Sequence, residues 1–429
     1  MNLGQKIKLE RLKSHMTQQQ LAEGICSTSY LSKIEKNHVV PKQTIQRALF
    51  NRLNITETPA ELDESTFMSD LLIAYHAILE SQSPDHARIA FNTFYSEQIT
   101  FTKQENFYTT NLYLLYFAVI AKEPASQVKH LLYGMLAIKY KFTAYQKYVF
   151  HVVRALYHYE QNEFEEAHLQ ATSAEKIQSL HHVAEDIEYA SLLFLEGLIY
   201  FRTYEHGNAF SKVNKALQLF TQYEIHEQML KAYNLLGLIN LQFGNFEQTL
   251  KYLNDGYNYA VQLDKTSHYG QLLQNIGYTY ARMQQPKVAI QYYRRSLKVK
   301  ELPLPQLVTI HSIIKEYSKI DNGEKILKWC QEGLAIIEAH DLKDAALSYH
   351  YHFHIYPMLH HLEPFKPYCL ENAIQHFTSL KDHRNVQKYA LALAKGYETM
   401  GNFEKAVHYY RLANEASFAV RGIKAWQDL

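Results

Sequence analysis

Three glycines spaced 40 residues apart constrain the fold of this chain most strongly. Gly197, Gly237 and Gly277 each lie inside a helical pattern, in Leu-Glu-Gly-Leu-Ile-Tyr, Leu-Leu-Gly-Leu-Ile-Asn and Asn-Ile-Gly-Tyr-Thr-Tyr. A fixed period of this length is the signature of a repeat protein, in which each unit buries its apolar face against its neighbours. Glycine and proline are scarce after about residue 67, and no stretch alternates steadily between apolar and polar residues. The sequence therefore predicts an all-α array of helix pairs.

A second motif recurs downstream of these glycines, as Asn-Glu-Phe-Glu-Glu-Ala at 162–167, Gly-Asn-Phe-Glu-Gln-Thr at 244–249 and Gly-Asn-Phe-Glu-Lys-Ala at 401–406. The two motifs together resemble the tetratricopeptide repeat, which has Leu-Gly-x-x-Tyr on helix A, a Gly-Asn-Phe turn and alanine on helix B. The resemblance implies that helix B packs closely against the glycine. It also implies a right-handed superhelix whose concave face is lined by the A helices. Because the period exceeds the family's typical value of about 34, the helices or links should be longer.

These motifs place the helix pairs along the chain. The expected ranges are 105–138, 143–178, 187–222, 226–262, 267–300, 304–338, 343–380 and 382–418, with an earlier pair at 67–98. Pro286 and Pro364 are predicted to lie in the first turn of a helix B, where proline is favoured.

The first 55 residues follow a different pattern. Thr17 and Gln20 have the spacing of a capping box that opens a short helix, and Gly24 suits its left-handed exit. Ser27 can then cap a second helix. Two short helices joined by a tight turn form a helix-turn-helix, and the small polar residues that begin the second helix suit contact with base edges in the major groove.

This stretch resembles the Xre-type helix-turn-helix of phage repressors and bacterial regulators. The resemblance places Arg11 and Glu35 in a structural ion pair between helices one and three, and starts a fourth helix near Pro41. The residues expected nearest to DNA are Gln18, Ser27, Thr28, Ser29, Tyr30, Ser32, Lys33 and Lys36. Lys33 and Lys36 are expected to contact phosphates rather than bases.

Charge supports this division of labour. Residues 1–55 carry nine basic and three acidic side chains, a net charge of +6, whereas the whole chain has +1 and the remainder therefore −5. A basic head on a mildly acidic body fits a phosphate-binding module joined to a part that does not bind nucleic acid. The polar, proline-containing segment around Pro59 marks the junction. We therefore expect a helix-turn-helix domain at 1–58, a linker at 59–66, and about eight to nine repeat pairs at 67–429 that bind peptide and dimerise.

The concave face of such an array is a groove for an extended peptide or a partner helix. Amide side chains there can pair with a peptide backbone whatever its sequence, because each offers a donor and an acceptor. By registration on the helix-A glycines, the candidate peptide-binding residues are Lys231, Asn234, Gln271, Gln274, Asn275, Tyr278, His311 and His352.

Head and body together resemble the RRNPP family of Gram-positive quorum-sensing regulators, which join an Xre-type head to a tetratricopeptide body. The resemblance implies a cytoplasmic, homodimeric transcription factor whose partners are double-stranded operator DNA and an imported signalling peptide. It also implies that Asn275 contacts the peptide backbone. Two alternatives remain: an interaction protein whose repeats hold another protein, such as a phosphorelay partner, and a DNA-binding regulator that senses a small molecule.

Other classes of function find little support. The sequence has no phosphate-binding glycine loop and no nucleophile motif, so we expect neither an enzyme nor a cofactor. His350 and His354 share a helix face, but no glutamate stands where a metalloprotease motif needs one, so no metal is expected. Three scattered cysteines favour reduced thiols in the cytosol. The longest apolar run, Leu112 to Ala121, is too short to span a bilayer, so we expect no membrane association and interpret it as a buried core helix.

Overall fold

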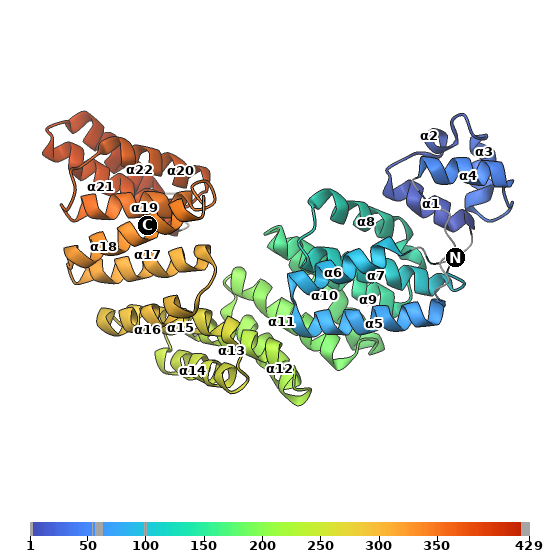
Figure 1. Ribbon diagram of the computed structural model, residues 1–429, viewed down its shortest axis with the longest axis horizontal. Coiled ribbons are helices and arrows are strands. Elements are labelled where there is room, and N and C mark those ends of the chain that lie inside the picture. The colour runs from blue at the N-terminus through green and yellow to red at the C-terminus, as the bar shows by residue number, and fades with distance from the viewer. Residues whose placement is uncertain (1–2, 54, 56–62, 98, 100, 422–429) are drawn as a thin grey trace. The chain divides into compact units, whose positions relative to one another are not determined.

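The structure is a computed structural model that describes all residues except 1–2, 54, 56–62, 98, 100 and 422–429 (Figure 1). Within the described residues every regular element is a helix. The all-α fold class, with a helix-turn-helix followed by tetratricopeptide-type helix pairs, is confirmed. The chain forms two compact units, residues 1–239 and residues 240–429.

The head consists of four short helices, α1 (Leu3–Lys13), α2 (Gln18–Ala22), α3 (Thr28–Glu35) and α4 (Gln43–Arg52). The predicted capping box is present, because the Thr17 side chain accepts from the Gln20 amide while the Gln20 side chain accepts from the Thr17 amide. Gly24 has a φ of +69° and so provides the left-handed exit from α2. Ser27 caps α3, with its hydroxyl accepting from the Tyr30 amide at 3.1 Å.

Nine helix pairs follow in the described residues. They are α5 (Glu64–Ser81) and α6 (Pro84–Ser96), α7 (Gln104–Ile120) and α8 (Ala125–Ile138), α9 (Ala144–Glu160) and α10 (Phe164–His181), α11 (Asp186–Arg202) and α12 (His206–Gln222), α13 (His226–Gln242) and α14 (Phe246–Gln262), α15 (Thr266–Arg282) and α16 (Pro286–Val299), α17 (Pro303–Lys319) and α18 (Gly323–Ala339), α19 (Leu347–Leu359) and α20 (Pro367–Ser379), and α21 (His383–Thr399) and α22 (Phe403–Arg421). A short 3₁₀ helix, η1 (Lys139–Lys141), follows α8.

The 40-residue period has a simple structural origin. Helices α13, α14 and α15 are each 17 residues long, and links of three residues join them. The helices are thus longer than in the typical tetratricopeptide repeat, as expected. Gly244 and Gly401, in the two Gly-Asn-Phe turns, have φ values of +73° and +76°. Glycine is favoured at these positions because a left-handed backbone has no steric cost for it.

The helix-A glycines allow close packing within a pair, as predicted. A methyl group built on Gly197 of α11 would overlap the Cγ2 atom of Val213 on α12. On Gly277 of α15, it would lie 2.7 Å from the Cδ1 atom of Tyr293 on α16. Val213 and Tyr293 are both buried, so neither has free space to move into.

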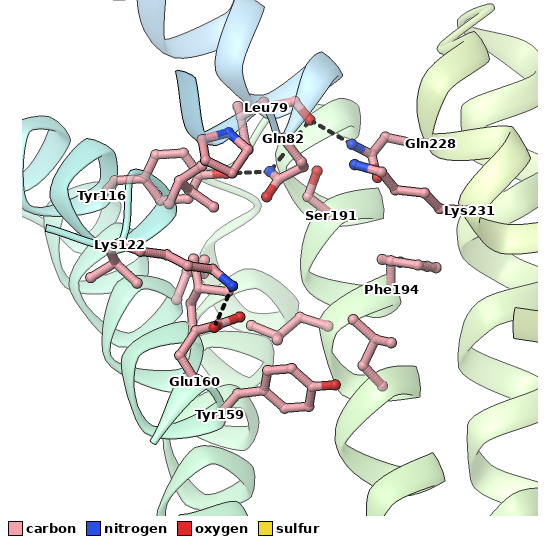
Figure 2. A pocket seen from close by; sticks show the side chains of 17 residues that line it. Leu79, Gln82, Tyr116, Lys122, Tyr159, Glu160, Ser191, Phe194, Gln228 and Lys231 are labelled. Atoms are coloured by element: carbon pink, nitrogen blue, oxygen red, sulfur yellow. Dashed lines mark hydrogen bonds and ion pairs between the residues drawn. The ribbon is translucent and has the colours of Figure 1, made fainter. Parts of the chain in front are cut away.

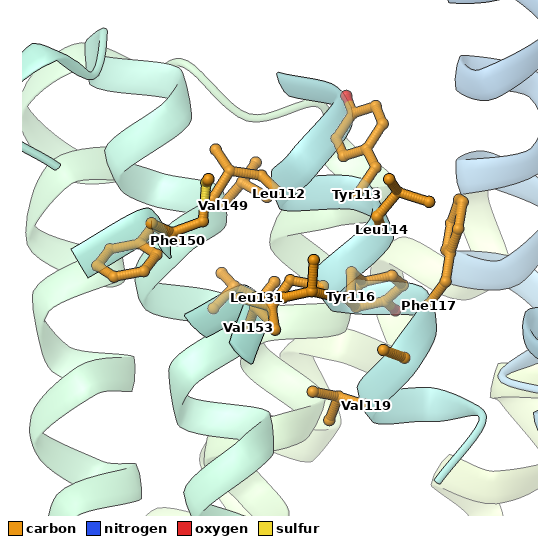
Figure 3. Close-up of a cluster of buried hydrophobic side chains, with 14 of the residues drawn as sticks. Leu112, Tyr113, Leu114, Tyr116, Phe117, Val119, Leu131, Val149, Phe150 and Val153 are labelled. Carbon is orange, nitrogen blue, oxygen red and sulfur yellow. The ribbon is translucent and has the colours of Figure 1, made fainter. Parts of the chain in front are cut away.

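Helix α7 forms the centre of the first unit (Figure 3). Every residue from Leu112 to Ala121 is buried, and Tyr116 and Phe117 are among the largest fully buried side chains. Side chains of α8 and α9, including Leu131 and Phe150, surround it. The interpretation of this run as a buried core helix is confirmed, and no described helix is long and apolar enough to cross a membrane.

One of the two proline predictions is wrong. Pro286 is the first residue of α16, as predicted, but α20 begins at Pro367 and Pro364 lies in the link before it. Pro367 therefore takes the first-turn position, where the missing amide hydrogen costs no hydrogen bond.

The head is not separated from the repeats as a compact unit of its own. Helix α1 packs against α8, and the aromatic rings of His15 and Tyr133 meet edge to face at 5.0 Å. The Lys13 side chain is buried over Gly134, where a methyl group would lie 2.8 Å from the lysine Cγ atom. Of the predicted linker at 59–66, residues 59–62 lie outside the described residues, and α5 already begins at Glu64.

Gly197→Ala should destabilise the first unit by about 1–3 kcal/mol, because its methyl group must displace the rigid, buried Val213 side chain. Urea unfolding of the full chain, followed by circular dichroism, measures this. The matched control is Gly207→Ala on α12, where nothing lies within 4 Å of the added methyl group. If both variants unfold at the same urea concentration, close packing at Gly197 does not matter for stability.

Candidate functional site

The outer face of α3 is polar and accessible. Leu31, Ile34 and Glu35 of this helix are buried against the head. Of the predicted DNA-contacting residues, five are exposed and three are partly buried. The exposed ones are Ser27, Thr28, Ser29, Lys33 and Lys36, and the partly buried ones are Gln18, Tyr30 and Ser32. This arrangement leaves the start of α3 free to enter a major groove.

A buried ion pair holds α3 in place, as predicted. The Arg11 guanidinium donates to both carboxylate oxygens of Glu35, at 2.6 and 3.0 Å, and to the Met16 carbonyl at 2.8 Å. Gln18 also belongs to this network, because its Nε2 atom donates to Glu35 Oε2 at 2.7 Å. Its contact with DNA stays a prediction. In this structure one of its amide hydrogens is engaged in the hydrogen bond to Glu35.

The first unit contains an apolar cavity of about 290 Å³ that includes Lys231 in its lining (Figure 2). At one end, Lys231 donates to the Ser81 carbonyl at 3.1 Å and Gln228 to the Glu80 carbonyl at 2.9 Å. Both side chains of α13 thereby satisfy carbonyl groups at the C-terminus of α5. Burial lowers the pKa of Lys231. Among the predicted peptide ligands, Lys231 and Asn234 belong to this unit and the others to the second.

The second unit contains a larger cavity of about 820 Å³, which we call the α15–α17 cavity. Its polar lining comprises Thr266, Ser267, Gln271, Gln274, Lys300 and Glu301, and its apolar lining comprises Val299, Leu302, Leu304, Pro305, Val308, Ala345 and Tyr349, with Gly270 between them. Two predicted ligands, Gln271 and Gln274, therefore share this cavity. Gln274 donates to the Ser312 hydroxyl at 2.9 Å, and Tyr278 on the same helix is 39 % exposed.

Lys300 is a functional candidate that the sequence reasoning missed. Its ammonium group contacts the Thr309 hydroxyl at 2.7 Å, the Pro305 carbonyl at 3.3 Å and Gln274 Oε1 at 3.4 Å. Burial lowers its pKa to about 8. The helix-A register cannot identify Lys300, because this residue follows the end of helix B at Val299.

The predicted ligands His311 and His352 lie in an aromatic cluster rather than in an open groove. Their rings stack with centroids 4.1 Å apart, and His352 is only 4 % exposed. His352 Nδ1 is also hydrogen-bonded to the Tyr389 hydroxyl. Burial lowers the pKa of His352 to about 3 and holds the pKa of His311 well below its usual range, with the positive charge of Lys388 as a smaller cause. Both rings are therefore neutral at pH 7.

The described part of the chain contains no recognisable metal site. No group of three histidine, cysteine or acidic side chains there is arranged to hold a metal ion. The rings of His350 and His354 do meet, with centroids 4.6 Å apart, but no third ligand joins them. Cys26, Cys330 and Cys369 form no disulfide with one another.

Comparisons with known proteins agree with this architecture. Residues 7–59 match a helix-turn-helix family model, and residues 270–301 and 388–419 match a tetratricopeptide-repeat model. The transcriptional activator NprA of Geobacillus stearothermophilus is 27 % identical over 409 residues, which cover 92 % of this chain and 98 % of that protein.

In both modules the chain is similar to the RRNPP family of regulators. It joins a helix-turn-helix head to a tetratricopeptide body. Among solved RRNPP structures, the apo form of the quorum sensor NprR from Bacillus thuringiensis shares the fold with a TM-score of 0.66 at 19 % identity, covering 82 % of this chain and 98 % of that one. NprR in complex with its cognate peptide NprX is similar with a TM-score of 0.54 at 18 % identity, covering 82 % and 99 %.

Acidification should destabilise the chain through its buried histidines. The unfolded state takes up a proton on His352 below about pH 6.5, whereas the native state does so only near pH 3, so stability is lost as the pH falls through this window. Between pH 7 and pH 5 the loss is up to about 2 kcal/mol for this one group. Urea unfolding of the full chain at both pH values measures it.

His352→Phe keeps the ring stacked against Phe377 but cannot titrate, so its loss on acidification should be smaller. His340→Gln, at an exposed position, serves as the control and should retain the full loss. Equal pH dependence in the wild type and in His352→Phe would contradict the neutral, buried state of His352.

Proposed function

We propose that this chain is a homodimeric, peptide-responsive transcriptional regulator. Its head binds operator DNA through α3, and its repeats bind a short signalling peptide. The observation that carries the proposal is that one chain combines an exposed polar recognition helix with a cavity that contains the amide side chains Gln271 and Gln274.

The geometry of the head supports DNA binding. Ser29 and Lys33 lie on the exposed face of α3, while the Arg11–Glu35 pair fixes this helix against α1. Small polar side chains at the start of a recognition helix can approach base edges, and lysines further along can reach phosphates. A dimer would place two such helices on half-sites about one helical turn apart.

Two observations support a peptide as the ligand of the repeats. The NprR quorum sensor, whose fold this chain shares, has been solved with its cognate peptide NprX. The α15–α17 cavity also offers amides beside apolar side chains, which suits a peptide backbone with small apolar residues. Binding would regulate the heads by favouring one arrangement of the repeats over another.

Ser29→Ala combined with Lys33→Ala should abolish sequence-specific DNA binding while leaving the fold intact. A base contact contributes about 1–3 kcal/mol of discrimination between the right and the wrong base. Removal of one phosphate contact lowers the slope of the logarithm of the binding constant against the logarithm of the salt concentration by about one. Fluorescence anisotropy with duplexes selected from a random pool by the wild-type protein measures both. Lys129→Ala, on α8 outside the head, is the control. Undiminished specific binding by the double variant would show that α3 is not the recognition helix.

Asn275→Ala and Gln271→Ala should each weaken peptide binding about tenfold without unfolding the array, since each removes side-chain hydrogen bonds to the peptide backbone. Calorimetry of the full chain against peptides encoded by small reading frames beside its gene tests this. Gln262→Ala, at the exposed end of α14, should bind as the wild type does. Unchanged affinity in both groove variants would refute the assignment of α15 to the peptide site.

A further inference from the structure

We infer that the α15–α17 cavity binds a carboxylate group of its peptide ligand, which pairs with the Lys300 ammonium group. The aliphatic side chain next to that carboxylate would lie against Leu304 and Val308. This inference rests on the proposed function, and it specifies the chemistry that the ligand must present at one place.

Lys300 carries a charge that nothing in the described structure neutralises. All three of its contacts, to Thr309, Pro305 and Gln274, are with neutral oxygen atoms. Glu301 also lines the cavity, but it is exposed, and its charge is not among the causes that shift the pKa of Lys300. A partly buried ammonium group without a carboxylate partner has lost hydration without gaining an opposite charge. A carboxylate from a ligand would supply that charge.

The position of Lys300 is built into the fold. A methyl group on Gly270 of α15 would lie 2.8 Å from Lys300 Cγ and 3.2 Å from Cε, so the glycine leaves room for the lysine side chain to cross this helix. The Ser296 hydroxyl fixes the same stretch by donating to the Gly270 carbonyl at 2.6 Å. Gln306 adds a further tie by donating to the Lys300 carbonyl at 2.6 Å.

The weakest of the lysine contacts is also the one that a ligand can replace. The 3.4 Å contact to Gln274 Oε1 is the longest of the three, whereas those to Thr309 and Pro305 come from one turn of α17. An incoming carboxylate oxygen can take the place of the Gln274 oxygen, which can then accept a hydrogen bond from the peptide backbone while the Gln274 Nε2 atom keeps its bond to Ser312. Charge-assisted pairs of this kind are stronger than the neutral contact they would replace.

The carboxylate could come from the C-terminus of the peptide or from an aspartate or glutamate side chain. A synthetic library of seven-residue peptides, prepared once with free and once with amidated C-termini, distinguishes these sources. Each library is incubated with the full-length protein, and bound peptides are separated by size exclusion and identified by mass spectrometry. We expect enrichment either of the free-acid library or of peptides with an acidic residue at one fixed position.

Lys300→Met should reduce this carboxylate-dependent enrichment about tenfold or more, because methionine retains most of the aliphatic chain but lacks the charge. Lys298→Met is the matched control on the same segment, since Lys298 is exposed and lines no part of the cavity. Unchanged thermal unfolding of both variants shows that the fold is intact.

The pH dependence gives an independent readout. In the wild type, the affinity for an enriched peptide should fall above about pH 8, where Lys300 loses its proton. In Lys300→Met it should remain flat over the same range. Peptides enriched without regard to carboxylates, and equally by Lys300→Met, would overturn the inference while leaving the proposed function standing. No enrichment of any peptide by the wild type would refute both.

Discussion

The close contact between the two helices of each pair is the constraint on which the rest of the structure depends. A single pair cannot bury its own apolar faces, so the chain is stable only when successive pairs stack. Gly197 against Val213 and Gly277 against Tyr293 show how this contact is made. The glycine on one helix leaves a space, and a larger side chain on the other helix occupies it. These contacts fix the A helices, and the A helices carry Gln271 and Gln274 into the α15–α17 cavity.

Much of this architecture could be predicted because local chemistry and long-range packing agree. The 40-residue glycine period, the Gly-Asn-Phe turns and the Thr17 capping box each have a direct local cause, and each is found where it was expected. Pro364 was misplaced because two prolines stand three residues apart, and the turn signal does not say which of them begins the helix.

The candidate site was harder to predict, because its properties depend on tertiary surroundings. His352 has the helix-A position of a ligand, yet the rings of His311 and Phe377 enclose it from either side. Lys300 is the opposite case: the sequence around it does not distinguish it from other surface lysines. Only the folded chain reveals that Gly270 makes room for it and that its contacts are uncharged.

Helix α1 contributes to two hydrophobic cores at once. Ile7 is buried in the core of the head, whereas Leu9, two residues later, is buried in the core that also contains Phe67 and Leu131 of the repeats. Substitutions on this short helix are therefore constrained from two sides, because one side packs in the head and another packs against the repeats. If the head were joined to another repeat array, Leu9 and Lys13 would lose the surface of α8 against which they pack. Exchange of heads between such proteins therefore requires that the matching surface of α8 be exchanged as well.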